Sequence, residues 1–294
     1  MKKKNIRSTV QTPKENPAGK VKIRQLPTGV RGLQEMLDGG LPEFSFNIVA
    51  GAPGCGKTTL AHQIMFANAT PRKPPLYFTV LGEPGLKMLR YQQQYSFFDF
   101  EKLNKAIRFV NLSDVVLEAD LRSVLQEIQK EVEAADPGLV IVDSFRTVAR
   151  KGLGVLSEME LQGFIQKLAL QLTSWQATTF LLGVYSQNEM RDNPVFTVAD
   201  SLFELTQNVE RNSVTRKLQI MKLRGQASVP GLHTIRITND GLQAFSRTVG
   251  FSPHTGHSGS FQSRSSRHRR SGASKRRKRP IIDSPVPRIS LMTS

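Results

Sequence analysis

The sequence is poor in the residues that build disulfide frameworks and membrane spans. Among its 294 residues there is one cysteine, Cys55, so neither an internal disulfide nor a zinc-binding cysteine cluster is possible. No stretch approaches the roughly 18 consecutive apolar residues that a membrane helix requires. The basic start is not followed by an apolar segment, so no signal peptide is expected. These absences favour a reducing, cytoplasmic compartment.

Acidic residues are scarce at both ends of the chain, whose net charge is +17. Residues 1–25 contain eight Lys or Arg and one acidic residue, and residues 251–294 contain ten and one. Any attraction for a polyanion is therefore a property of the ends. The composition predicts a flexible basic arm over 1–25, one folded domain over 26–246, and a disordered Ser/Arg/Lys-rich basic tail over 247–294.

The middle of the chain alternates strand patterns with helix patterns. Apolar runs predict strands at 44–50, 76–81, 107–112, 139–143 and 179–184. Apolar residues at helical spacing predict helices at 57–68, 84–95, 120–135 and 157–175. Four shorter strand-like runs follow, at 202–205, 218–221, 234–237 and 242–245. This order predicts an α/β fold with a mainly parallel central sheet, flanking helices and a C-terminal antiparallel extension.

One loop in this pattern carries a phosphate-binding motif. Residues 51–58 fit G-x-x-x-x-G-K-[ST] between a predicted strand and a predicted helix. Backbone N–H groups of such a loop point at phosphate oxygens, and the helix start adds a positive dipole end. Lys57 is expected to reach the β- and γ-phosphates, and Thr58 to bind Mg²⁺. The motif predicts ATP and Mg²⁺ as ligands, with nucleotide-binding residues Gly51, Ala52, Pro53, Gly54, Cys55, Gly56, Lys57, Thr58 and Thr59.

Acidic and polar residues follow three of the predicted strands. Asp143 ends an apolar run that we expect to form a buried strand next to the phosphate-loop strand, where it would bind Mg²⁺ directly or through water. Glu83 could accept a proton from the attacking water, and the alternative is an ordinary surface-loop glutamate. Gln187 either senses the γ-phosphate or is a plain polar loop residue.

Two further features allow a simple structural interpretation. From their residue types alone, Lys222 and Arg224 fit the solvated end of a hairpin. Cys55 stands at a loop position that accepts any small residue, and a low-pKa redox thiol at a helix N-terminus is the alternative.

Several spaced motifs, taken together, resemble the KaiC-like branch of the RecA superfamily over about residues 24–246. The first is Thr28–Pro42, with Gln34 in place of the usual Asp, and the phosphate loop follows it at the family's distance. The others are Asp143-Ser144, Val198–Asp200, Lys222–Gly225 and Ile235–Phe245. The resemblance implies a RecA-like fold and, often, a hexameric ring with ATP between subunits. Lys222 and Arg224 would then act as catalytic cations on the neighbouring subunit's γ-phosphate.

The sequence also departs from that family. Gly82-Glu83 stands where the family usually has two adjacent glutamates. The family's clock protein has two such domains in tandem, whereas this chain has one. The second domain of the clock protein is phosphorylated on adjacent Ser and Thr. Here only Thr197 falls near that position, and it is the one candidate for an autokinase activity.

The sequence therefore predicts a KaiC-like regulatory ATPase that acts as a nucleotide-switched homo-oligomer with an unidentified protein partner. One alternative is a DNA-acting ATPase similar to recombinases or helicases, because basic tails give salt-dependent affinity for phosphates. Apart from Phe251 and Phe261, however, the tail lacks aromatics for base stacking. The other alternative is a regulatory module that binds ATP but barely hydrolyses it, which Gly82 motivates.

Overall fold

The computed structural model describes six segments of the chain, residues 23–80, 85–118, 121–144, 158–185, 195–210 and 213–246. Most of the predicted basic arm and the whole predicted tail lie outside these residues, as do Gly82, Glu83 and Gln187. Among the described helices, none combines the length and the apolar character needed to cross a membrane.

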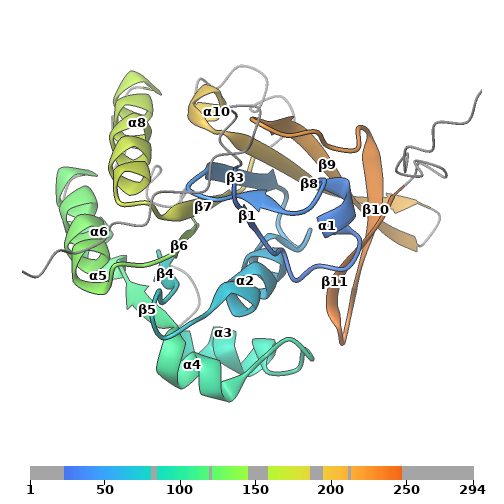
Figure 1. The fold of residues 1–294 in the computed structure, drawn as a ribbon, viewed down its shortest axis with the longest axis horizontal. Helices are drawn as coiled ribbons and strands as arrows, with labels where there is room; N and C mark the ends of the chain where they lie inside the picture. The colour runs from blue at the N-terminus through green and yellow to red at the C-terminus, as the bar shows by residue number, and fades with distance from the viewer. Residues whose placement is uncertain are drawn as a thin grey trace, which may run out of the picture. The chain divides into compact units, whose positions relative to one another are not determined.

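The described residues form one large sheet and one small one (Figure 1). The nine-stranded sheet has the order β11-β10-β9-β8-β3-β7-β6-β4-β5. Its parallel part consists of β3 (Phe46–Gly51), β4 (Leu76–Thr79), β5 (Arg108–Asn111), β6 (Leu139–Asp143), β7 (Thr178–Gly183) and β8 (Ser201–Glu210). Its antiparallel part consists of β9 (Ser213–Leu223), β10 (Leu232–Thr238) and β11 (Gly241–Phe245). The predicted mainly parallel sheet with an antiparallel extension is confirmed.

Helices cover both faces of this sheet, and each face has its own apolar core (Figure 1). One face packs against α1 (Leu33–Met36), α2 (Lys57–Asn68), α3 (Gly85–Gln92) and α4 (Phe100–Ala106). The other packs against α5 (Ser113–Glu118), α6 (Leu121–Ala135), α8 (Glu158–Ser174) and α10 (Val195–Val198). Strands β3, β6 and β7 are buried on both faces, which explains their unbroken apolar runs.

The position of β6 corrects one expectation. Asp143 was expected on a strand next to the phosphate-loop strand, but β7 lies between β3 and β6. An apolar run predicts that a strand is buried on both faces, but it does not predict which strands lie beside it in the sheet. The order of the strands depends on where the helix between two strands leads the chain back into the sheet. The loops that follow β3 and β6 still open at the same edge of the sheet, since both strands run parallel to β7.

The start of the domain is held by a small sheet and by Gln34. Strand β1 (Gln25–Leu26) pairs with β2 (Leu41–Pro42). Gln34 Oε1 accepts from the Thr28 backbone N–H at 2.9 Å, and its amide nitrogen donates to the Gly39 carbonyl. The longer glutamine therefore bridges the two ends of the 28–42 segment, at the position where the resemblance leads one to expect aspartate.

The structure also contains elements that the sequence pattern did not indicate. Helix α4 is short, and the Asp99 carboxylate caps it by accepting from the Glu101 and Lys102 backbone N–H groups. Strands β8 and β9 extend well beyond the four-residue runs that predicted them and pair along their whole length. Their outer halves are mostly polar, with uninterrupted polar residues at 206–208 and 215–217, so apolar content alone understates them.

Candidate functional site

The predicted phosphate loop, residues 51–58, connects β3 to α2 in the described structure. Gly54 has φ 77° and Gly56 has φ 108°, conformations that side-chain-bearing residues rarely adopt. A Cβ on Gly51 would lie 2.1 Å from the Leu205 carbonyl oxygen of β8. Gly54 and Gly56 are therefore needed for the backbone conformation of the loop, and Gly51 is needed for close approach to the neighbouring strand.

Lys57 begins α2 and lies under the loop. Its Nζ donates to the Gly51 and Ala52 carbonyl oxygens, both at 2.9 Å, and the residue is buried. The ammonium group is thus held at the helix N-terminus, where backbone N–H groups and the helix dipole also favour an anion. Cys55 is fully buried in the same loop, which fits its interpretation as a small packing residue.

Thr58 and Asp143 come together although they are 85 residues apart in the chain. Thr58 Oγ1 donates to Asp143 Oδ2 at 2.7 Å, and the same carboxylate oxygen accepts from the Tyr77 hydroxyl at 2.7 Å. Burial of Tyr77, followed by the nearby charge of Asp143, raises the pKa of its phenol well above the usual value. Tyr77 therefore keeps its proton and acts as a hydrogen-bond donor to the carboxylate.

The Thr58–Asp143 pair suits a magnesium ion shared with phosphates. Mg²⁺ prefers oxygen ligands and is usually bound by one or two protein groups together with water and substrate phosphates. Among the described residues, no group of three or more His, Cys, Asp or Glu side chains could enclose a metal by itself. A hydroxyl and a carboxylate beside a phosphate loop are the donor set that such a shared site needs.

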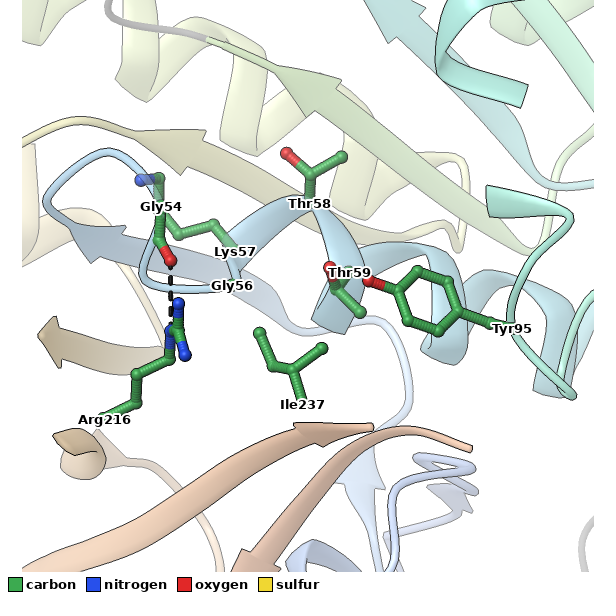
Figure 2. Close-up of a pocket in the computed structure, with 8 residues that line it drawn as sticks. All are labelled: Gly54, Gly56, Lys57, Thr58, Thr59, Tyr95, Arg216 and Ile237. Atoms are coloured by element: carbon green, nitrogen blue, oxygen red, sulfur yellow. Dashed lines mark hydrogen bonds between the residues drawn. The ribbon is translucent and has the colours of Figure 1, made fainter. Parts of the chain in front are cut away.

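A pocket of about 430 Å³ opens beside the phosphate loop, within the usual size range of small-ligand sites (Figure 2). Gly54, Gly56, Lys57, Thr58 and Thr59 line it on one side. Tyr95, Arg216 and Ile237 complete its wall, and Figure 2 shows the Tyr95 ring and the Ile237 side chain flanking the start of α2.

These three wall residues come from distant parts of the chain and were missed by the sequence analysis. Arg216, on β9, donates through Nε to the Gly54 carbonyl oxygen at 3.2 Å. Tyr95 follows α3, and its ring stacks on Phe97 with centroids 5.2 Å apart. The Ser96 backbone N–H donates to the Asn239 carbonyl oxygen at 2.8 Å, which ties this loop to the β10–β11 turn near Ile237. No local motif marks such residues, because only the folded sheet brings them together.

Comparisons with known proteins identify the family of the chain. The family model described as "ATPase: KaiC" matches residues 26–249. The chain belongs to the KaiC ATPase family. Circadian clock oscillator proteins KaiC are among its relatives: one from Picosynechococcus sp. is 26% identical over 79% of this chain and 47% of its own length. Another, from Rippkaea orientalis, is 26% identical over 76% of this chain and 44% of its own length.

The chain spans about half the length of these KaiC relatives. A solved KaiC-like protein from the archaeon Pyrococcus horikoshii matches it with a TM-score of 0.65, at 23% identity, over 76% of this chain and the whole of that one. This likeness confirms the RecA-like α/β fold that the sequence predicted. Family membership supports ATP binding by an ATPase domain.

Lys222 and Arg224, which the KaiC resemblance makes catalytic cations, lie away from the pocket. Both are near the end of β9, where Lys222 pairs with Leu202, whereas the phosphate-loop strand meets β8 at Leu205 through Gly51. Arg224 forms an ion pair with Asp200 at 3.2 Å, and Lys222 Nζ donates to the Thr197 carbonyl oxygen at 3.0 Å. Partial burial, and then the Arg224 charge, lower the pKa of Lys222.

Three other candidates from the sequence have different outcomes. Glu83 lies outside the described residues, in the segment between β4 and α3, and Gln187 lies outside them after β7. Both roles stay predictions. Thr197 is described: it lies exposed on the four-residue helix α10, and its carbonyl is engaged by Lys222.

One buried group beside the site was not singled out from the sequence. His62, on α2, is fully buried with its ring 4.7 Å from that of Tyr77. Among the described residues, neither ring nitrogen has a partner in good hydrogen-bond geometry, although the Gln92 side chain is close enough to favour the protonated ring. Burial lowers the pKa of His62 from 6.5 to about 4, against the opposing effects of the Gln92 side chain and the Asp143 charge. The ring is therefore neutral at physiological pH.

Proposed function

We propose that the protein binds Mg-ATP at the phosphate loop and hydrolyses it as an assembly of identical chains. The observation that carries this proposal is the Thr58–Asp143 hydrogen bond of 2.7 Å beside a complete phosphate loop. A hydroxyl, a carboxylate and Lys57 converge there on the place where a triphosphate would lie. Thr58 and Asp143 would hold Mg²⁺ there, and when bound the metal would supply positive charge to the phosphates.

Each part of the nucleotide has a candidate partner in the described structure. The loop amides and Lys57 would hold the β- and γ-phosphates, while Thr58 and Asp143 would bind the metal. Tyr95 and Ile237 line the same pocket and offer apolar faces against which the base would pack. Arg216 would stabilise the loop through Gly54 and add positive charge beside the phosphates.

Hydrolysis requires groups that the pocket itself does not supply among the described residues. Glu83 is proposed as the group that accepts the proton of the attacking water. Lys222 and Arg224 are proposed to act on the nucleotide of a neighbouring copy, because their end of β9 is far from their own phosphate loop. In such an arrangement, turnover depends on assembly because each nucleotide contacts two chains. The nucleotide bound between two chains would in turn change how those chains associate.

The test compares phosphate release by wild type and two lysine variants. Lys57→Ala should abolish nucleotide binding and turnover, because it removes the cation under the loop. Lys73→Ala is the matched control, since Lys73 pairs with Asp136 on the surface and does not line the pocket. Turnover by Lys57→Ala at the wild-type rate would contradict the proposal.

A DNA-acting ATPase is the second candidate, and the basic residues of the sequence ends favour it. Phosphate contacts by Lys and Arg would give sequence-independent binding that weakens as salt rises. The discriminating measurement is ATP turnover with and without DNA, for the full chain and for a chain that ends at residue 246. Stimulation that disappears with the tail supports this candidate, and turnover that ignores DNA excludes it.

A further inference from the structure

The carboxylate of Asp143 is held from two sides, and only one of them belongs to the phosphate-loop motif. Thr58 and Tyr77 both donate to the same oxygen, Oδ2, at 2.7 Å. Thr58 is part of the motif. Tyr77 lies on β4, outside every motif that the sequence analysis identified, and it is one of the largest fully buried side chains of the protein.

The register of the sheet explains how Tyr77 reaches the carboxylate. Tyr77 pairs with Ile141 of β6, two residues before Asp143, and all three side chains belong to the sheet face covered by α2. His62 follows Thr58 by one helical turn, so it lies one layer below Thr58 on the same side of α2. The His62 and Tyr77 rings pack in that lower layer, 4.7 Å apart, and the Tyr77 hydroxyl extends upward to Asp143.

Packing holds the Tyr77 ring in place independently of the hydrogen bond that its hydroxyl makes. The His62 ring lies against it on one side, and the Phe109 ring of β5 lies 5.4 Å away, centroid to centroid. A ring held in this way keeps its hydroxyl oxygen beside the Asp143 carboxylate. An aliphatic side chain at position 77 would fill the same layer and leave Asp143 with Thr58 as its single described donor.

We propose that Tyr77 is a positioning residue for the magnesium site, an inference that rests on the proposed function. Two donors on Oδ2 hold the carboxylate in one rotamer and leave its other oxygen, Oδ1, to face the metal or a metal-bound water. Outer groups that orient a metal-binding side chain typically change metal affinity by about 10–100-fold when they are removed. Tyr77 therefore acts on the metal through Asp143 and makes no contact with the nucleotide.

The experiment measures the Mg²⁺ concentration needed for half-maximal binding of a fluorescent ATP analogue. Tyr77→Phe keeps the ring and removes the hydroxyl, and it should raise this concentration about tenfold. Binding in EDTA should be equal in variant and wild type, because the loop and Lys57 are untouched. Turnover should return toward the wild-type value at saturating Mg²⁺. Tyr91→Phe, at an exposed position on α3, controls for loss of a tyrosine hydroxyl.

The possible outcomes separate the two proposals. If wild type binds no nucleotide, the proposed function fails. If wild type binds and Tyr77→Phe has the same Mg²⁺ midpoint within twofold, the role of Tyr77 fails while the proposed function stands. An equal loss of nucleotide affinity with and without Mg²⁺ would also overturn this role, because it would show that the hydroxyl supports packing alone. Binding of Mn²⁺, followed by its paramagnetic signal, gives a second readout that does not depend on turnover.

Discussion

Arg216 lies in the first half of β9, and Arg224 directly follows the other end of that strand. Arg216 donates to the Gly54 carbonyl oxygen of the phosphate loop, whereas Arg224 pairs with Asp200. Eight residues of extended chain separate them, which is about 27 Å along the strand. Arg216 therefore lies at the candidate pocket of its own chain, whereas Arg224 lies away from that pocket.

This separation predicts that Arg224 works between copies. Lys57→Ala lacks a functional phosphate loop and keeps Arg224. Arg224→Ala keeps a functional phosphate loop and lacks the Arg224 cation. Each variant alone should lose most of its turnover. When the two are co-expressed with different tags and purified as mixed assemblies, some interfaces combine an intact loop with an intact Arg224, so turnover should reappear. We expect about a quarter of the wild-type rate for random mixing in equal amounts.

The same experiment distinguishes a structural role for Arg224. If its ion pair with Asp200 only stabilised the end of β9, the Arg224→Ala chain would stay defective in any mixture. Mixed assemblies with no more activity than the two variants alone would contradict action between copies. Lys73→Ala mixed with wild type serves as the control for the effect of mixing and tagging.

The residues that line the pocket predict that Tyr95 contributes to binding of the base and not to binding of the phosphates. Tyr95→Ala removes an aromatic face from the pocket, and stacking on such a face contributes roughly 1–3 kcal/mol to base binding. ATP affinity should therefore fall about 5- to 150-fold, while the affinity for tripolyphosphate stays unchanged. Competition binding with both ligands measures this. Equal losses for ATP and tripolyphosphate would show that Tyr95 supports the loop and does not contact the base.

The proposed role of Glu83 predicts a variant that binds ATP normally but hydrolyses it slowly. Replacing a general base by a neutral amide should lower turnover by about 10²–10⁴-fold. Glu83→Gln should therefore bind ATP as wild type does and release phosphate far more slowly, in single-turnover measurements with Mg²⁺. Equal and negligible rates in both proteins would favour a module that binds ATP without hydrolysing it.

The buried, neutral ring of His62 predicts that the free energy of unfolding decreases as the pH falls. Because burial holds its folded pKa near 4, while an unfolded histidine has a pKa near 6.5, the unfolded chain binds more protons between these values. Stability that is present above pH 6.5 is lost as the pH falls toward 4, by roughly 3 kcal/mol. His62→Leu lacks this group, so its unfolding free energy should fall less over that range.

Chemical denaturation at pH 7, 5.5 and 4 tests this prediction. Other acidic groups titrate over the same range in both proteins, so the quantity of interest is the difference between the two curves. Parallel curves for wild type and His62→Leu would show that His62 accepts its proton in the folded state as readily as in the unfolded one.

Much of the phosphate site could be predicted because it is local in sequence. The motif and the apolar pattern together predicted α2 at residues 57–68, and the structure has Lys57–Asn68. The strand that ends in Asp143 was also predicted with its correct bounds. In both cases the signal is a short run of residues whose chemistry and periodicity agree.

The parts that the sequence did not predict depend on long-range register. The insertion of β7 between β3 and β6 follows from the path of the crossovers, which no single run encodes. Arg216 looks like any charged residue on an exposed strand until the pairing of β8 with β9 brings it to Gly54. Tyr77 reads as an ordinary aromatic strand residue until the β4–β6 register places it two residues below Asp143.

We propose above that the loop from Gly51 to Thr58 holds the phosphates of a magnesium-bound nucleotide. Calorimetric titration of the full chain with ATP, in Mg²⁺ and then in EDTA, measures this directly. We expect saturable binding of one nucleotide per chain that is strengthened by Mg²⁺ and absent in Lys57→Ala. Absence of any heat of binding in Mg²⁺, or equal binding by wild type and Lys57→Ala, would contradict it.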